Sequence, residues 1–134
     1  MSDNTDLTRG WLLKAESDLT TCRRIVESPG PYDTACFHAQ QAVEKYLKGL
    51  LAFAGMPIPR THNLEELERL CLSLPNPAPA LTGIDLTELT PYAVQMRYDT
   101  EFWPDQSVAK EALEVAESVR RAILSCVPAE THPV

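Results

Sequence analysis

The chain has 134 residues and a formal net charge of −7 at pH 7, and 44% of its residues are hydrophobic. This length suits one domain with one core, and the apolar fraction excludes a disordered chain. The acidic balance excludes salt-driven binding of nucleic acid over a broad surface, although it leaves room for a local basic pocket. We therefore expect residues 1–134 to form a single domain with its core over about residues 8–127.

No stretch approaches the roughly 20 apolar residues that a membrane-spanning helix requires, so no membrane contact is expected. Residues 1–6 are polar and partly acidic, unlike a secretory signal, which favours a cytoplasmic protein. The four cysteines include no C-x-x-C pair and stand at apolar positions of helical patterns. We expect reduced thiols that pack as small hydrophobic groups, and neither a metal nor a cofactor.

The first half of the chain predicts two long helices. The first spans about residues 8–27 and has one apolar face, made of Trp11, Ala15, Leu19, Cys22 and Val26. The prolines and glycine of residues 28–31 end it. The second helix begins near Tyr32 or Asp33, with Asp33 as its N-cap, and continues to about Phe53.

The region after the second helix predicts a third helix and a loop. Asn63 and Glu66 have the spacing of a capping box at a helix start. The apolar stripe of this helix runs from Leu64 to Leu74, and the prolines within residues 75–79 predict a loop.

Two helices are predicted in the last third. Thr90 and Pro91 suit an N-cap and first turn, which predicts a short helix over about residues 91–98. Asp85, three residues before Glu88, predicts an extra turn ahead of it. The last helix begins near Ser107 and ends at Pro128, and we expect a loose tail over residues 128–134.

These elements predict an all-α protein. No segment has the alternation of a strand, and no internal repeat is present. Short connections favour antiparallel neighbours, so we expect an up-and-down bundle of about five helices.

Three separated segments resemble landmarks of HEPN domains, a name that stands for higher eukaryotes and prokaryotes nucleotide-binding. Residues 36–51, CFHAQQAVEKYLKGLL, resemble the second-helix signature of that family. Residues 62–67, HNLEEL, resemble the next landmark, and Arg97-Tyr98-Asp99 before an alanine-rich helix resembles the last. The order and spacing agree over about residues 8–127.

The resemblance implies a helical bundle that is often a homodimer and is often encoded beside a small nucleotidyltransferase. Many relatives are the toxin or antitoxin halves of two-gene modules. Some are metal-independent ribonucleases with an Arg, four to six other residues and then a His near the start of the last helix. This chain resembles the branch that lacks that motif, because the positions after Arg97 where the His would stand hold Phe102, Trp103 and Pro104.

The candidate ligand-binding residues are cationic or aromatic: Lys45, Lys48, Arg97, His62 and Tyr98. Lys45 and Lys48 share a helix face, either as a phosphate-binding pair, or as solvated lysines or in an ion pair with Glu44 or Glu65. Arg97 either pairs with Glu44 inside the bundle or holds a ligand.

His62 and Tyr98 also have two interpretations each. His62 either belongs to the cap of the third helix or lines a pocket near Lys48. Tyr98 forms an aromatic cluster with Phe102 and Trp103, which serves packing in the core or a dimer, or else base stacking.

Gln40, Gln41 and Glu44 are the candidate structural polar residues of the second helix. Gln40 falls on the apolar stripe, so we expect it to be buried and hydrogen-bonded to backbone or across a dimer seam. His38 has no ligand partner one turn away, which argues against a metal site. Gly49, inside the helix, predicts close contact with a neighbouring helix.

Three hypotheses follow for function. The first is a nucleotide- or partner-binding module, a homodimer that acts with a small nucleotidyltransferase in a two-gene system of the toxin–antitoxin kind. The second is a divergent ribonuclease that uses Arg97 for phosphate and His62 or His38 as base. The third is a non-catalytic dimeric scaffold or antitoxin whose buried polar groups specify assembly.

Overall fold

The structure is a computed structural model that describes residues 2–76 and 78–133. Over these residues it contains five α-helices, two 3₁₀ turns and no strand, which confirms the predicted all-α bundle. The helices are α1 (Ser2–Val26), α2 (Asp33–Phe53), α3 (Leu64–Leu72), α4 (Tyr92–Tyr98) and α5 (Gln106–Cys126), and the 3₁₀ turns are η1 (Pro79–Leu81) and η2 (Ala129–Thr131).

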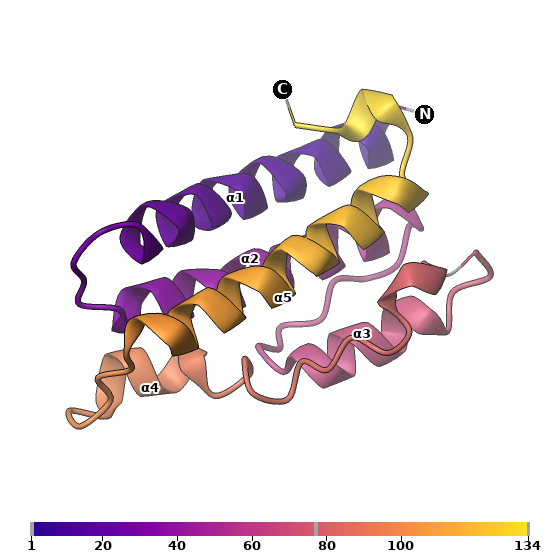
Figure 1. Ribbon diagram of the computed structural model, residues 1–134. Coiled ribbons are helices and arrows are strands. Elements are labelled where there is room, and N and C mark those ends of the chain that lie inside the picture. Colours follow the sequence, from indigo (N-terminus) through magenta and orange to yellow (C-terminus); the bar gives the residue numbers. More distant parts are fainter. Residues whose placement is uncertain (1, 77, 134) are drawn as a thin grey trace.

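The three long helices α1, α2 and α5 lie side by side, and α3 and α4 lie along one flank of this group (Figure 1). The chain reverses between α1 and α2, whereas α5 runs in the same direction as α2 because α3, α4 and their connections carry the chain back (Figure 1). The Gln106 side-chain amide donates to the Val26 carbonyl at 2.7 Å, which ties the start of α5 to the end of α1.

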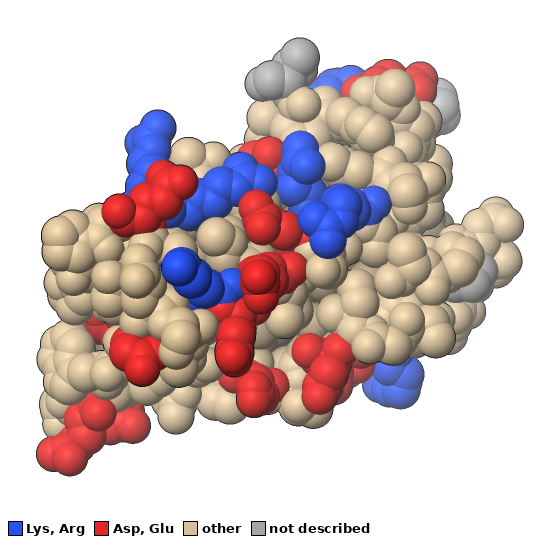
Figure 2. Space-filling model, viewed as in Figure 1, with Lys and Arg blue, Asp and Glu red and all other residues tan. Residues whose placement is uncertain are grey.

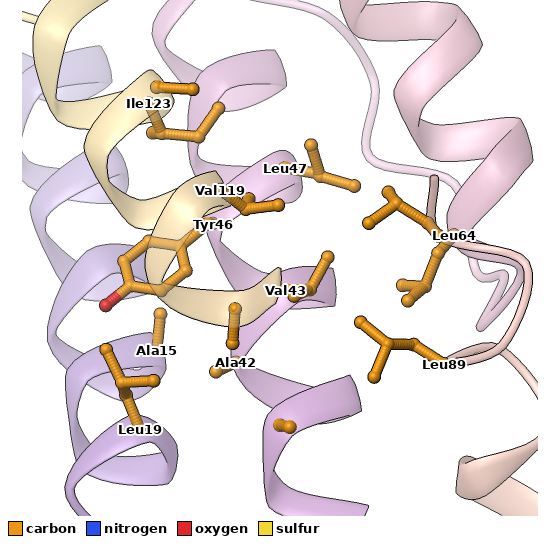
Figure 3. Close-up of a cluster of buried hydrophobic side chains, with 14 of the residues drawn as sticks. Ala15, Leu19, Ala42, Val43, Tyr46, Leu47, Leu64, Leu89, Val119 and Ile123 are labelled. Carbon is orange, nitrogen blue, oxygen red and sulfur yellow. The ribbon is translucent and has the colours of Figure 1, made fainter. Parts of the chain in front are cut away.

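The core surrounds α2, which has buried residues on several faces. Figure 3 shows its side chains between those of α1 and α5 on one side and those of α3 and the 81–91 connection on the other. The labelled members of this core are Ala15, Leu19, Ala42, Val43, Tyr46, Leu47, Leu64, Leu89, Val119 and Ile123. Burial of these apolar surfaces is the main force that holds the helices together.

Gly49 lies where α1 and α2 approach each other closely. A Cβ at this position would stand 3.0 Å from Cδ2 of Leu12 and 3.4 Å from Cβ of Trp11. The predicted close helix contact at Gly49 is confirmed, since only a hydrogen fits between the two helices without displacing Leu12.

The starts of two helices differ from the sequence expectation. α1 begins at Ser2 instead of residue 8, because its first turn is polar and carries no apolar periodicity to reveal it. The N-cap of α2 is Tyr32, which forms no side-chain cap bond, and Asp33 lies inside the first turn. There its carboxylate faces the positive end of the helix dipole, a favourable position that is distinct from capping.

The capping prediction for α3 is confirmed, because the Asn63 side chain accepts a hydrogen bond from the Glu66 amide at 2.9 Å. The prediction for Thr90 is wrong: Pro91 is the N-cap residue of α4. The Thr90 hydroxyl instead accepts from the Leu64 amide at 3.2 Å, so it joins the two helix starts.

The predicted extra turn before α4 is present as hydrogen-bonded turns and not as a helix, because the Leu86 carbonyl accepts from the amides of Leu89 at 3.1 Å and Thr90 at 3.4 Å. Asp85 accepts from the Thr87 amide at 3.0 Å and from the Thr87 hydroxyl at 2.7 Å. These two bonds satisfy the Asp85 carboxylate locally, two residues along the chain, and residues 82–91 contain no helix.

Residues 128–133 are packed against the bundle, where a loose tail had been expected. η2 contacts α1, and Nε of Arg9 donates to the Glu130 carbonyl at 3.0 Å. Thr131 is fully buried and its hydroxyl donates to the Pro128 carbonyl at 2.7 Å. The two ends of the described chain therefore meet at the same end of the bundle (Figure 1). No helix between residues 2 and 133 has both the length and the apolar character needed to cross a bilayer.

Candidate functional site

The polar side chains of α2 bond in three different directions. We call Gln40, Glu44, Lys48 and His62 the buried cluster, and Asp18, His38 and Lys45 the α1–α2 cluster. A third group joins Tyr46 to Glu16 and Arg120. Each of the three groups joins α2 to a neighbouring segment of the chain, and these bonds fix the geometry of its side chains.

The buried cluster is centred on the Glu44 carboxylate. Oε2 accepts from Nζ of Lys48 at 3.0 Å, and Oε1 accepts from Nδ1 of His62 at 2.9 Å. The side chains of Glu44 and Lys48 are 5% and 8% exposed, whereas that of His62 is 63% exposed. The ion pair of Glu44 and Lys48 is therefore almost fully desolvated, and the exposed His62 lies between Glu44 and solvent.

Gln40 completes the buried cluster. Its Nε2 donates to Oε1 of Glu44 at 3.3 Å and to the His62 carbonyl at 3.2 Å, and its Oε1 accepts from Nε2 of Gln41 at 2.7 Å. Gln40 is fully buried within one chain. The expectation that Gln40 is buried and bonded to backbone is confirmed, and its other bonds are to Glu44 and Gln41 of the same helix.

Lys48 is enclosed on its other side by an aromatic ring. Its Nζ lies 5.7 Å from the centroid of Trp11, which is a cation–π distance. A lysine that is 8% exposed and held between a carboxylate and an indole is not accessible to an incoming phosphate. We assign Lys48 to the scaffold of the bundle.

Lys45 belongs to the separate α1–α2 cluster. Its Nζ donates to Oδ2 of Asp18 at 2.5 Å, and Nδ1 of His38 bonds to Oδ1 of Asp18 at 2.8 Å. Burial raises the pKa of the Asp18 carboxyl, but the bonds and charges of His38 and Lys45 outweigh burial and leave this pKa below its usual value. Lys45 and Lys48 thus have different acidic partners, and the predicted phosphate-binding pair is not formed.

The group around Tyr46 was missed in the sequence. The buried Tyr46 hydroxyl donates to Glu16, and Nε of Arg120 bonds to Oε2 of Glu16 at 2.6 Å. Burial and the neighbouring Glu16 raise the pKa of Tyr46. The available signal was Tyr46 itself, because a tyrosine on an apolar stripe needs a partner for its hydroxyl.

Arg97 does not reach the interior. Its Nε donates to the Ala93 carbonyl of its own helix at 2.9 Å, and it forms no ion pair with any described residue. The expected pairing with Glu44 is wrong, since that carboxylate is satisfied by Lys48, Gln40 and His62.

Aromatic rings hold Arg97 at the surface. Its Cζ lies 5.7 Å from the centroid of Phe37 and 5.7 Å from that of Tyr98. Phe37 also meets His38 edge to face, with ring centroids 5.3 Å apart. We call His38, Phe37, Arg97 and Tyr98 the α2–α4 surface, because these contacts place them in one continuous group.

The expected aromatic cluster of Tyr98, Phe102 and Trp103 is not a core element. Tyr98 is 73% exposed and Trp103 is 66% exposed. Phe102 packs instead against Tyr92, with ring centroids 5.4 Å apart. Tyr98 therefore presents its ring to solvent beside the Arg97 guanidinium.

The α2–α4 surface combines a guanidinium with an exposed aromatic ring, two kinds of group that suit phosphates and bases. A guanidinium with unused N–H donors can grip phosphate oxygens in a bidentate manner. Exposed aromatic faces stack bases without selecting among them. Among residues 2–76 and 78–133, no group of three or more potential ligands is placed to hold a metal ion.

Comparison with protein families matches residues 8–126 of the chain to the HEPN domain. Neither the curated proteins nor the solved structures include a match to this chain.

Proposed function

The chain belongs to the HEPN domain family, and we propose that it is a nucleotide-binding module whose phosphate contact is Arg97 on the α2–α4 surface. Membership of the family supports a nucleotide-binding or ribonuclease-like module over most of the chain length. The proposal narrows that statement to one surface and one class of ligand.

The observation that carries the proposal is that the Arg97 guanidinium is held in place without a carboxylate partner among the described residues. The cations inside the bundle are paired with carboxylates: Lys45 with Asp18, Lys48 with Glu44 and Arg120 with Glu16. Arg97 is held by two rings and a backbone carbonyl, which fix its position and leave its charge available. A fixed, uncompensated guanidinium favours a phosphate, because little side-chain entropy is lost on binding.

The rest of the surface fits the other parts of a nucleotide. Tyr98 offers an exposed ring for the base, and His38, which meets Phe37 edge to face, has its side chain 29% exposed. The acidic net charge weakens long-range attraction of an anion, so local contacts must supply the affinity. We therefore expect binding in the micromolar range or weaker.

Isothermal titration with ATP, GTP, UTP and AMP tests the proposal. Wild-type protein is expected to bind at least one of them, and Arg97→Ala to weaken binding by about tenfold, as for loss of one charged contact of about 1.4 kcal/mol. Arg69→Ala is the matched control, because Arg69 is also exposed and lies on α3 away from this surface. Equal loss in the two variants, or no heat with any nucleotide, would overturn the proposal.

A second candidate function is metal-independent cleavage of RNA, favoured by the Asp18–His38 contact. The carboxylate bonds Nδ1 of His38 at 2.8 Å, which fixes the ring and leaves Nε2 for proton transfer. His62 has the same kind of contact with Glu44, but it lies in the buried cluster and has no contact with Arg97. His38 is therefore the better candidate base of the two.

In that reaction, Nε2 of His38 takes the proton of a ribose 2′-hydroxyl while Arg97 holds the phosphate. The 2′-oxygen bonds to phosphorus, the bond to the 5′-oxygen breaks, and water protonates the leaving oxygen. The products are a 2′,3′-cyclic phosphate and a 5′-hydroxyl end.

An RNA cleavage assay separates the two functions. Cleavage that falls at least 100-fold in both His38→Ala and Arg97→Ala, and stays unchanged in His62→Ala, would support the ribonuclease. Equal background in all four proteins would reject it and leave nucleotide binding intact.

A homodimer and a small nucleotidyltransferase partner are further proposals, which rest on the family resemblance. The exposed apolar side chains of Val94 and Trp103, at 57% and 66%, support a contact surface near α4. Light scattering on wild type and on the double variant Val94→Ser with Trp103→Ser tests the dimer, which the double variant should weaken.

Co-purification with the product of a neighbouring gene tests the proposed partnership with a small nucleotidyltransferase.

A further inference from the structure

A groove lies between residues 83–92 and α5, and none of the polar residues of α2 lines it. Its volume is about 540 Å³. Its floor is apolar and includes Leu89 from the connection, Tyr92 at the start of α4, and Val108, Ala112 and Val115 from α5. The three α5 residues follow one another at one-turn spacing, so the floor extends along two turns of the helix.

The rim of this groove is acidic on both sides. Asp85 and Glu88 stand on the connection, and Glu111 and Glu114 stand on α5. No Lys, Arg or His lines the groove, and no ion pair joins any of the four carboxylates to a cation within the described residues. Figure 2 shows carboxylates gathered over α5 and the chain below it, while the basic side chains gather mainly where α5 meets α1.

The acidic residues of the rim also act on two neighbouring groups. Burial, together with the nearby Cys36, Glu88 and Glu111, raises the pKa of Tyr92 to about 12. Burial and the charges of Asp85 and Glu65 raise the pKa of the Glu68 carboxyl. Burial is the largest cause of both shifts, and the carboxylates add to it in the same direction.

These properties exclude several ligands. Four carboxylates repel a nucleotide or any other phosphate. The same residues are not arranged as a group that could hold a metal ion. A second copy is also a poor occupant, because a two-fold contact through this groove would set acidic rim against acidic rim.

We propose that this groove binds a basic amphipathic helix of a partner protein. Its apolar face would cover Leu89, Tyr92 and Val115, and its lysines or arginines would meet Glu88 and Asp85 on one rim and Glu111 and Glu114 on the other. The apolar floor supplies affinity and the paired acidic rims supply orientation, as in other grooves that hold a helix.

The test is fluorescence polarisation with a labelled peptide that forms a helix with leucines on one face and lysines on the other. Two comparison peptides are used: a scrambled isomer of the same composition, and a version with glutamate in place of lysine. We expect micromolar binding of the first peptide and at least tenfold weaker binding of both others. Binding should weaken as salt is raised from 0.05 to 0.5 M, because the Debye length falls from about 14 to about 4 Å.

The double variant Glu88→Lys with Glu111→Lys should weaken binding of the basic peptide at least tenfold. Its matched control is Glu27→Lys with Glu101→Lys, which makes the same change in net charge at exposed positions outside the groove. Equal loss in the two variants would show nonspecific charge attraction and overturn the proposal, as would tight binding of the scrambled peptide or no binding at all. Circular dichroism establishes that each variant is folded.

This proposal stands apart from nucleotide binding. Arg97→Ala leaves the groove intact, so that variant should bind the basic peptide as wild type does. The groove variant in turn should retain nucleotide binding, so failure of one proposal does not imply failure of the other.

Discussion

At the scale of single residues, the charged groups of α2 serve the interior of the protein more than its surface. Glu44 and Lys48 are one turn apart on the same helix and almost fully buried. Replacing both with apolar groups removes a desolvation cost along with the attraction, whereas removing one leaves a charge alone. The two kinds of change should therefore have very different effects on stability.

We predict that Lys48→Met destabilises the protein by about 3 kcal/mol, because it leaves the Glu44 carboxylate buried with only neutral partners and the exposed His62. The double variant Lys48→Met with Glu44→Leu should recover at least half of this loss. Urea denaturation monitored by circular dichroism measures both values.

The matched control is Lys110→Met, at an exposed position of α5, with an expected change within about 0.5 kcal/mol. If Lys48→Met cost no more than this control, the buried ion pair would have no structural role.

Asp18 provides a pH-dependent contribution to stability. Its folded pKa lies below the unfolded value of about 3.9, so its stabilising effect is complete above that value and is lost as the pH falls through the folded pKa. We predict that Asp18→Asn loses stability at pH 7 but loses less than wild type when the pH falls from 5 to 3. Urea midpoints at pH 7, 5 and 3 measure the difference.

Glu101→Gln, at an exposed position, serves as the control for this effect. If wild type and Asp18→Asn lost the same amount of stability between pH 5 and pH 3, Asp18 would not be the source of the pH dependence.

The sequence shows which residues of α2 are polar, but it does not show which residues they contact. Helical spacing places Lys45 and Lys48 on one face, yet Lys45 bonds to Asp18 across the α1 interface and Lys48 bonds within α2. The choice depends on the register of α1 against α2, which involves residues 27 positions apart. No local pattern encodes that register, so the sequence could not show that Lys45 and Lys48 bond to different carboxylates.

At the scale of elements, most of the helices follow from local patterns. The bounds of α2 match the prediction closely, because an apolar stripe and flanking glycine and prolines define both ends. Predictions failed where a polar residue has a choice of partner, as at Thr90, whose hydroxyl bonds to the start of α3 instead of capping α4. Cap residues with one local option, such as Asn63, were predicted correctly.

Two helical glycines give opposite predictions at this scale. A Cβ added at Gly10 would meet nothing within 4 Å, whereas one added at Gly49 would meet Leu12 at 3.0 Å. Gly10→Ala should stabilise the protein by up to about 1 kcal/mol, because alanine is the better helix former. Gly49→Ala should destabilise it by about 1 kcal/mol, since overpacking against the buried Leu12 exceeds the same propensity gain.

Urea denaturation of the two variants measures this difference, and each glycine serves as the control for the other. If Gly49→Ala were as stable as Gly10→Ala, α1 and α2 would not be in the close contact that the structure shows.

At the scale of the whole molecule, charge is separated between surfaces. The α2–α4 surface offers a guanidinium without an acidic partner, and the groove beside α5 offers carboxylates without a basic one. A net charge of −7 favours the second surface for long-range attraction of a partner. The two proposed ligands, an anion and a basic helix, would therefore contact different parts of one small bundle.

The ends of the chain also hold the molecule together. Arg9 on α1 donates to the Glu130 carbonyl, and Thr131, the last residue of η2, is buried. We predict that removal of residues 129–134 lowers the free energy of unfolding by about 2 kcal/mol, because it uncovers part of the core and takes away the acceptor for Arg9. Urea denaturation of the shortened chain measures the loss.

A double-mutant cycle with Arg9→Met then isolates the contact between the two ends. In the full chain, Arg9→Met should cost about 1 kcal/mol, since it removes charged hydrogen bonds to the Glu130 carbonyl. In the shortened chain that acceptor is absent, so the same substitution should cost much less, and the difference is the energy of the contact. If Arg9→Met lowered the free energy of unfolding equally in the full and the shortened chain, Arg9 and η2 would contribute independently. The contact between η2 and α1 would then add no stability through Arg9.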